Sequence, residues 1–510
     1  MKNQLFKAIG IVTIINIVAR LIGFAKDAVV GMLFSKTEAD AIFFAYTIPN
    51  LIYLVVGGAI TTAFISIYSK LPTKEEKTKF LNIVFSYMTV IFIALTILLM
   101  IFVDPILKLS FRQLSSESFE ITKNLYLWMT PSTVLLVLSI WLSGVLNVHN
   151  RFSLSTFSTL LYNLVFLIFG VALVPILSFY SYGFGALLGA VFMILVLIYG
   201  IKKEKIQFRF QFAYTNEMKR LVNMTVPLIL GGAALQFYIF IQRIYAARFP
   251  EFDGLTTLLN NASKLTQFPQ AVLMTAVTTV IYPLLSKKVA ANEMDQIESL
   301  YQRGLRVLRL MLLPITVFVY FYAQDIVTIV FEYGKLTADD TILTAPLVQI
   351  LAISMYALAS SAYVTRFFYA MENTFLPVLI NVISVFGVTV LATNILIDYE
   401  GTNAIAWGTT ISAISNYILL VMFGRFILRL KVYEKDMKQL GKTWLFILVL
   451  GTVTYVSSLL LSFASSFFNV AMGLVIFVIV GALLMKLLKF PELEIFTRYL
   501  RSKRNKQVAE

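Results

Sequence analysis

The sequence contains no cysteine and a single histidine, His149. A chain without cysteine forms no disulfide, offers no thiolate nucleophile and builds no cysteine metal site. One histidine excludes a metal site built from several histidines. Charged residues are also scarce, at 14% of the chain, whereas soluble proteins carry about 25%.

Hydrophobic residues take the place of the missing charge, at 59% of the 510 residues, with a mean hydropathy of +0.83. This composition predicts an all-α integral membrane protein, since a spanning helix needs about 20 mostly apolar residues. The alternation of apolar and polar residues that is typical of the strands of membrane barrels does not recur along the chain. Hydropathy predicts about fourteen spanning segments, with approximate limits 7–34, 41–68, 80–106, 122–147, 153–178, 182–201, 221–249, 258–286, 304–331, 343–370, 375–397, 402–428, 440–464 and 467–489.

The net charge is +15. The positive-inside rule explains it better than a nucleic-acid partner does, because connections rich in basic residues alternate along the chain with connections that have few. The loops near Lys70 to Lys79 and Lys202 to Arg220 are basic, whereas "FYSYG" and "DYEGTN" have no basic residue. We therefore expect both termini in the cytoplasm. The first hydrophobic run is too long for a signal peptide, so we expect it to be retained.

The chain also repeats itself. "AITTAFISIYSK" at 59–70 matches "AVTTVIYPLLSK" at 276–287, an offset of 276 minus 59, or 217, and at this offset Lys26 corresponds to Arg243. Two parallel halves are predicted, and transporters commonly bind substrate between such halves. The expected divisions are 1–203 (N-lobe), 204–220 (cytoplasmic linker), 221–430 (C-lobe), 431–490 (two extra helices) and 491–510 (basic cytoplasmic tail).

The first segment carries charged residues that are costly to place in lipid. Asn16, Arg20, Gly23 and Asp27 lie at helical spacing on one face, with Lys26 at its edge. A charge at the centre of a spanning helix costs roughly 2.5–3.5 kcal/mol on insertion scales. We expect this face to line a water-filled cavity. The alternative is that Arg20 and Lys26 have a purely structural role. Asp27 is either a counter-ion or a coupling site.

Further polar residues lie in other segments. Asn260 and Lys264 share a face near the start of segment 258–286, Asp40 and Asn50 lie in the second segment, and Arg243 lies in the seventh. Arg and Lys bind phosphate, the first through paired hydrogen bonds and the second as a point charge. We therefore predict that these cations converge on an anionic ligand. Snorkelling of Lys264 to the membrane surface is the alternative.

No catalytic motif is present: there is no Walker motif, no GxSxG and no HExxH. We expect a protein that is not an enzyme and needs no cofactor. Energy would come from an ion gradient, the membrane potential or the substrate's own gradient. The stretch from Trp444 to Met485 has no charge, which fits either close helix packing or an apolar groove for a lipid chain.

Several stretches resemble the MurJ (MviN) family of lipid II flippases. These are "VARLIGFAKDAVVGMLF", "ADAIFFAYTIPNL" and "GGAITTAFISIYSKL", then "NASKLTQFPQAVLMTAVTTVIYPLLSK", "VFEYGKLTADD" and "RFFYAMENTFLPV". The resemblance covers nearly the whole chain in order. It implies the fold of the multidrug/oligosaccharidyl-lipid/polysaccharide (MOP) exporters, with two six-helix lobes around a central cavity and two C-terminal helices beside them.

The resemblance also implies a function and a site. Lipid II, a polyprenyl-linked peptidoglycan precursor, would move from the inner to the outer leaflet of the bacterial cytoplasmic membrane. Arg20, Lys26 and Lys264 match the family's cavity cations, Asp27 and Asp40 its acidic positions, and Asn163 an asparagine of the fifth helix. The last two helices would hold the polyprenyl tail.

One departure from the family pattern concerns the second segment. Many members carry cations shortly after the Pro-Asn pair, whereas this chain has "NLIYLVVGGA" with Tyr53 and no charge. Arg243 is the residue that could compensate.

Four functions remain open from the sequence. The first is a monomeric lipid II flippase that works by alternating access, and the second a flippase for another polyprenyl-linked glycan of teichuronic, capsular or O-antigen type. The third is a cation-coupled multidrug exporter, and the fourth a lipid-binding or division-protein scaffold without transport. The coupling ion and the exact glycan are left open.

Overall fold

The structure is a computed structural model, and it describes residues 2–231, 234–371, 373–431, 437–461 and 465–490. In these ranges every regular element is helical, as the composition predicted. The predicted basic tail, 491–510, lies outside the described residues.

The first half of the chain forms the N-lobe. Its elements are α1 (Lys2–Leu33), α2 (Lys36–Leu51), the π-helix η1 (Ile52–Gly57), α3 (Gly58–Tyr68), α4 (Lys74–Ile101), α5 (Val103–Ser110), α6 (Ser116–Met129), α7 (Ser132–Val148), α8 (Phe152–Ala172), α9 (Val174–Leu177) and α10 (Tyr180–Lys203).

The second half forms the C-lobe and two further helices. The C-lobe elements are α11 (Asn216–Gly231), α12 (Ala234–Ala246), α13 (Leu255–Ala290), α14 (Met294–Phe321), α15 (Ala323–Phe331), α16 (Ala338–Ala370), α17 (Phe375–Val382), the π-helix η2 (Ile383–Val388), α18 (Thr389–Glu400) and α19 (Asn403–Ile427). The last two helices are α20 (Met437–Leu460) and α21 (Ser466–Leu487).

Each predicted spanning segment coincides with one helix or with a run of consecutive helices. Among the described residues, 10 helices are long and apolar enough to cross a membrane by themselves, or up to 11 if the bent pair α6 and α7 is one span. The segments formed by α1, by α11 with α12, and by α13 are not in that group. These are the segments that carry the predicted cations Arg20, Lys26, Arg243 and Lys264.

Several spans are broken where hydropathy predicted straight helices. Pro131 stands between α6 and α7, which are bent by 44°, because proline removes a helical hydrogen bond. In the N-lobe α4 gives way to α5 at Phe102, and in the C-lobe α14 gives way to α15 at Tyr322. The two breaks are 322 minus 102, or 220, positions apart, close to the repeat offset.

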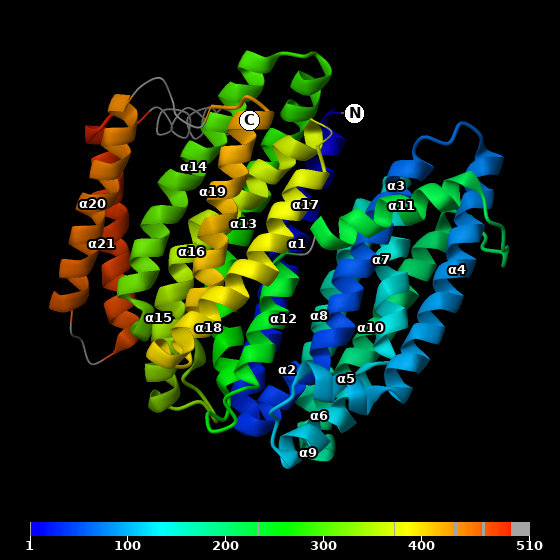
Figure 1. The fold of residues 1–510 in the computed structure, drawn as a ribbon, viewed down its shortest axis with the longest axis horizontal. Coiled ribbons are helices and arrows are strands. Elements are labelled where there is room, and N and C mark those ends of the chain that lie inside the picture. Colours follow the sequence, from blue (N-terminus) through cyan, green and yellow to red (C-terminus); the bar gives the residue numbers. More distant parts are fainter. Residues whose placement is uncertain (1, 232–233, 372, 432–436, 462–464, 491–510) are drawn as a thin grey trace.

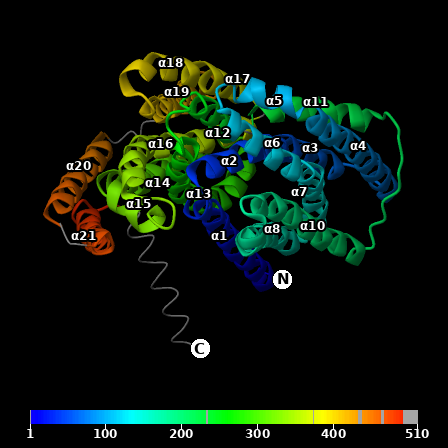
Figure 2. The same ribbon diagram turned by 90° about the horizontal axis from the view of Figure 1, so that it is seen from below.

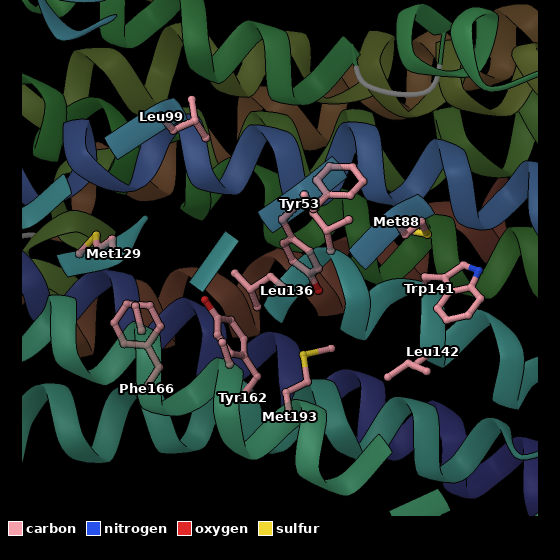
Figure 3. Close-up of a cluster of buried hydrophobic side chains, with 14 of the residues drawn as sticks. Tyr53, Met88, Leu99, Met129, Leu136, Trp141, Leu142, Tyr162, Phe166 and Met193 are labelled. Atoms are coloured by element: carbon pink, nitrogen blue, oxygen red, sulfur yellow. The ribbon is translucent and has the colours of Figure 1, made fainter. Parts of the chain in front are cut away.

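The lobes lie side by side (Figure 1), and each has its own main core, although Leu221 of α11 is buried in the core of the N-lobe and α11 contacts α3. Seen from the end of the molecule, α20 and α21 flank the C-lobe on the side away from the N-lobe (Figure 2). A small cluster of Leu310, Phe446, Leu450 and Phe490 packs them against α14. Figure 3 shows part of the N-lobe core, where Tyr53, Trp141, Tyr162 and Phe166 are buried with several methionines and leucines.

The lobes converge at the end opposite the N-terminus, where α2 and α12 lie together (Figure 1). Here α1 and α2 of the N-lobe contact α12, α13 and α15 of the C-lobe. We call this region the interlobe junction: residues 26–47 on one side, and 243–264 with 332–340 on the other. Five of the six charged residues predicted for the site lie in this junction, and Arg20 lies outside it.

Candidate functional site

A carboxylate bridges two lysines across the interlobe junction. Asp27 of α1 accepts from the Nζ of its neighbour Lys26 at 2.5 Å through Oδ1, and from the Nζ of Lys264 of α13 at 2.8 Å through Oδ2. Lys26 is 6% exposed and Asp27 9%, whereas the side chain of Lys264 keeps 35% exposure. Lys26 and Asp27 belong to the N-lobe, so the pair with Lys264 joins the lobes. Asp27 is therefore a counter-ion in this arrangement.

Aromatic side chains of the N-lobe surround the ammonium of Lys26. Its Nζ lies 4.4 Å from the ring centre of Phe166 and 5.3 Å from that of Tyr46, distances at which a ring face attracts a cation. The hydroxyls of Tyr46 and Tyr162 are hydrogen-bonded at 2.9 Å. The Tyr182 hydroxyl donates to the carbonyl of Lys26 at 3.1 Å. Lys26 is thus held from one side by α2, α8 and α10.

Arg243, in the last turn of α12, reaches across the junction to α2. Its Nη1 donates to the carbonyl of Phe43 at 2.9 Å and to the hydroxyl of Thr47 at 2.7 Å, and its Nη2 lies 3.5 Å from Oδ1 of Asn260. The guanidinium also lies 5.5 Å from the ring centre of Phe43. All of these partners are neutral, and Arg243 is 8% exposed. A cation from the C-lobe therefore lies against the second predicted segment, 41–68, which has no cation of its own.

Asp40 of α2 caps a helix of the opposite lobe. The backbone N–H groups of Thr256 and Thr257, in the first turn of α13, donate to its carboxylate at 3.1 and 2.7 Å, and the Thr257 hydroxyl donates at 2.6 Å. The residue before this helix is Gly254, with φ +88° and no side chain to act as a cap. The first N–H groups of a helix have no partner within it, so Asp40 supplies from the N-lobe what Gly254 cannot.

A second ion pair and a backbone contact lie at the rim of the junction. Lys36 pairs with Asp340 at 2.6 Å, and the N–H of Lys335 donates to the carbonyl of Met32 at 2.9 Å. Gly334 has φ +66°, and a Cβ there would overlap this carbonyl, so the close approach requires glycine. The "VFEYGKLTADD" stretch thus contributes to closing the junction.

The remaining predicted site residues lie near this network without joining its ion pairs. Arg20 is exposed on α1, six residues before Lys26 and therefore about 9 Å nearer the N-terminus along the helix. Asn50 is partly exposed on α2. Asn163 donates to the carbonyl of Ala19 at 3.4 Å and lies against Gly23, so it packs α8 onto α1.

A small cavity of about 10 Å³ separates α12 from α13. Its polar lining includes Arg243, Asn260, Lys264 and Gln267, which is the shared face that the sequence predicted for Asn260 and Lys264. A cavity of this size holds about one water molecule. The space between α12 and α13 therefore has no room for a larger anion in this arrangement.

Around the ion bridge the cations outnumber the carboxylates. Lys26, Lys264 and Arg243 are three cations, and Asp27 and Asp40 are two carboxylates, one of which is bonded to a helix terminus. Uncompensated charge in a poorly hydrated region favours a counter-ion. Separation of the lobes would expose lysine and arginine donors suited to phosphate. Among the described residues no group of His, Cys, Asp and Glu has the arrangement of a metal site.

Sequence reasoning missed the neutral partners of these charges. Thr47, Thr256, Thr257 and the aromatic pair Tyr46 and Tyr162 looked like ordinary membrane-helix residues. One signal was present: Gly254 before "LTTLLNN" leaves the predicted helix without a cap, and helices commonly have one. The signal says that a cap is needed, but not which distant residue provides it.

Comparison with known proteins identifies the family. The family model "Lipid II flippase MurJ" matches residues 29–483. A probable lipid II flippase MurJ of Rickettsia prowazekii is 26% identical over 432 residues, which cover 82% of this chain and 83% of the relative. The lipid II flippase MurJ of Burkholderia cenocepacia is 26% identical over 433 residues, with the same shares of 82% and 83%.

Solved structures agree on the fold. A lipid II flippase MurJ in an inward closed conformation superposes with a TM-score of 0.79 at 22% identity, covering 94% of this chain and 99% of that one. An inward-facing MATE transporter of the MOP superfamily gives 0.70 at 13% identity, covering 80% and 94%. The fold expected from the resemblance is confirmed. Since the family model covers most of the chain, this protein belongs to the MurJ lipid II flippase family.

Proposed function

We propose that this protein is a lipid II flippase of the bacterial cytoplasmic membrane that works by alternating access, as a monomer with both termini in the cytoplasm. The observation that carries the proposal is the ion bridge from Lys26 through Asp27 to Lys264. It joins the two lobes, contains more positive than negative charge with Arg243 beside it, and lies at the end of the lobes opposite the N-terminus.

Capture of the substrate would begin at the exposed cations. Arg20 is exposed on α1 and Lys264, a member of the bridge, is partly exposed. A pyrophosphate that reaches Lys264 competes with Asp27 for the same ammonium. Because that ion pair holds the lobes together, its replacement by phosphate weakens the junction when substrate is present. Binding and opening are thereby coupled without covalent chemistry, so the protein is not an enzyme.

The other residues have supporting roles in this proposal. Arg243 supplies the cation missing from the second segment and meets the head group once the junction opens. Asn50, Asn163 and Asn260 contribute polar atoms at the edges of the opened site. The polyprenyl tail stays in the bilayer beside α20 and α21. On α21, 6% of the most apolar 18-residue window is buried by protein, which leaves its surface available to a lipid chain.

The division of labour along the chain follows. Residues 1–203 and 221–430 are the moving lobes, 204–220 joins them, 431–490 supports the lipid tail and 491–510 is a basic cytoplasmic tail. The membrane potential, negative inside, would assist the return of a cationic site, at about 2.3 kcal/mol per charge per 100 mV. Unchanged flipping in proteoliposomes after the potential is dissipated would contradict this last step.

Complementation tests the proposal. The chain is expressed in cells depleted of their own lipid II flippase, with wild type, Lys264→Ala and Lys264→Arg compared at equal membrane levels. We expect growth with wild type and Lys264→Arg, and roughly tenfold less flipping with Lys264→Ala, which corresponds to about 1.4 kcal/mol. The matched control is Lys288→Ala. It removes an ion pair with Glu293, whose two charged atoms are 2.9 Å apart and which lies outside the junction.

The outcomes separate the candidate functions. Failure of the well-expressed wild-type chain would exclude lipid II as substrate and favour another polyprenyl-linked glycan, an alternative supported by the buried Tyr53 where many family members have a cation. Normal growth with Lys264→Ala and Arg20→Ala would favour a scaffold.

A further inference from the structure

The connection between the lobes has an alternating pattern that the flippase function does not use. Residues 206–215, which we call the interlobe strap, run from α10 to α11 without helical structure. Every second residue from 206 to 214 is large and apolar or aromatic, and three of the four between them are polar. The two sets are Ile206, Phe208, Phe210, Phe212 and Tyr214, and Gln207, Arg209, Gln211 and Ala213. Such alternation is typical of an extended chain with two different sides.

Two side chains of α4 hold the strap through its backbone. The N–H of Arg209 donates to Oδ1 of Asn82 at 3.0 Å, and the N–H of Gln211 donates to the hydroxyl of Ser86 at 2.7 Å. Asn82 and Ser86 are four residues apart and therefore share one face of α4, and both are buried. The strap is thus docked along α4 at two alternate N–H groups, those of residues 209 and 211.

Aromatic contacts complete the docking. Phe208 stacks on Phe85 of α4 with ring centres 4.6 Å apart, and Phe210 lies 5.4 Å from the same ring. Phe212 meets Tyr87 edge to face at 5.5 Å. The predicted linker is therefore packed along the N-lobe over these residues.

The outer side of the strap is apolar and uncovered by protein. Phe210 is 64% exposed, Phe212 56% and Tyr214 75%. The strap follows the outer edge of the N-lobe, on the side away from the C-lobe (Figure 2). These rings continue the exposed apolar surface of α4, which includes Val90, Ile91, Ile97 and Leu98. Lipid covers that surface in a spanning helix, so the strap's rings begin where the lipid-facing surface begins.

The level and charge of the strap indicate which part of the bilayer it meets. Asn82 lies eight residues into α4, about 12 Å from its charged start at Lys74. Residues 202–220 hold six basic side chains and two acidic ones, and one of the acidic ones, Glu204, is paired with Arg151 at 2.5 Å. Aromatic rings gather at membrane interfaces, and basic clusters beside them attract anionic lipids.

We propose that the interlobe strap is a lipid-binding element. Its aromatic side chains at 210, 212 and 214 insert into the interface of the cytoplasmic leaflet, and Arg209 with the flanking lysines binds the phosphates of anionic phospholipids. The strap thereby anchors the N-lobe to the leaflet. This binding is independent of the transported substrate.

Site-directed spin labelling tests the proposal, and the absence of native cysteine makes each label unique. Single cysteines at 210, 211, 212 and 213 are labelled in the full-length protein in nanodiscs of phosphatidylglycerol or of phosphatidylcholine. Collision rates with lipid-soluble oxygen and a water-soluble nickel complex give the depth of each label. Ile97→Cys on α4 serves as the reference for a label in lipid, and Glu75→Cys as the reference for a label in water.

We expect a period of two. The ratio of the oxygen to the nickel collision rate should be at least threefold higher for labels at 210 and 212 than for labels at 211 and 213. In phosphatidylglycerol we expect 210 and 212 to lie deeper and to be less mobile than in phosphatidylcholine. Asn82→Ala, which removes one tether, should abolish the alternation. Equal nickel accessibility at all four positions would overturn the insertion, and identical depths in the two lipids would overturn the anionic-lipid binding.

Discussion

Replacement of Asp40 by alanine should open the interlobe junction. The Asp40 carboxylate accepts three hydrogen bonds from the first turn of α13, two from N–H groups and one from the Thr257 hydroxyl. It does so only while the lobes are together, because Asp40 belongs to α2. After Asp40→Ala, the closed arrangement keeps these donors buried without an acceptor. When the lobes separate, water replaces the lost acceptor.

The size of the effect follows from helix capping. Loss of an N-cap costs about 0.5–2 kcal/mol, and a buried donor left without a partner costs about 1–3 kcal/mol. The penalty falls on the closed arrangement alone, so we expect its free energy to rise by about 2 kcal/mol relative to the open one. This corresponds to roughly a 30-fold shift in the ratio of the two. Asp40→Asn keeps one acceptor oxygen without the charge, so its shift should be roughly fivefold.

The shift can be measured as a distance between the lobes. Gln113 of the N-lobe and Asp253 of the C-lobe line one cavity at the junction, and Gln113 and Glu251 are both exposed. Spin labels on Gln113→Cys and Glu251→Cys, in a chain without other cysteines, report the two arrangements as a short and a long distance. Pulsed electron resonance then gives their ratio in wild type, Asp40→Asn and Asp40→Ala.

A matched control separates junction opening from general loss of stability. Thr73 caps α4 within the N-lobe by accepting from the N–H of Glu76 at 3.2 Å. Thr73→Ala should lower thermal stability by a similar amount and leave the distance distribution unchanged. The reasoning fails if Asp40→Ala lowers stability as Thr73→Ala does without populating the long distance.

Three further predictions concern packing and polar contacts. Asn261 is 1% exposed and both of its amide atoms lack a partner among the described residues, so Asn261→Leu should favour the closed arrangement by about 1 kcal/mol, seen with the same spin labels. A Cβ on Gly185 would lie 2.9 and 3.0 Å from two backbone atoms of α8; Gly185→Ala should lower the thermal midpoint by several degrees, at a cost of about 1–3 kcal/mol, whereas Gly387→Ala, with open space around it, should not. Arg243→Lys keeps the charge but loses the paired donors, so we expect about tenfold slower flipping in proteoliposomes than with Thr47→Val, and equal rates would refute a role for the guanidinium.

The sequence predicted the helical segments well because membrane spanning depends on local composition. A run of about 20 apolar residues satisfies its backbone within the helix whatever surrounds it. The match between 59–70 and 276–287 and the charges of α1 are also visible in the sequence without any structure. The breaks at Phe102 and Tyr322 could not, since no proline or glycine occupies either position and hydropathy sums are insensitive to bending.

Residue types alone showed that this protein crosses a membrane many times, predicted two related halves, and marked Lys26, Asp27 and Lys264 as charges that needed an explanation. Tertiary structure decided which charges meet. Asp27 lies between two lysines, Arg243 bonds to neutral atoms of α2, and Asp40 caps a helix of the other lobe, while Arg20 stays outside the network. The physical reason is that a buried charge is stabilised by whatever lies within a few ångströms. Several of those neighbours come from the opposite lobe, and only the docking of the lobes brings them together with the charges.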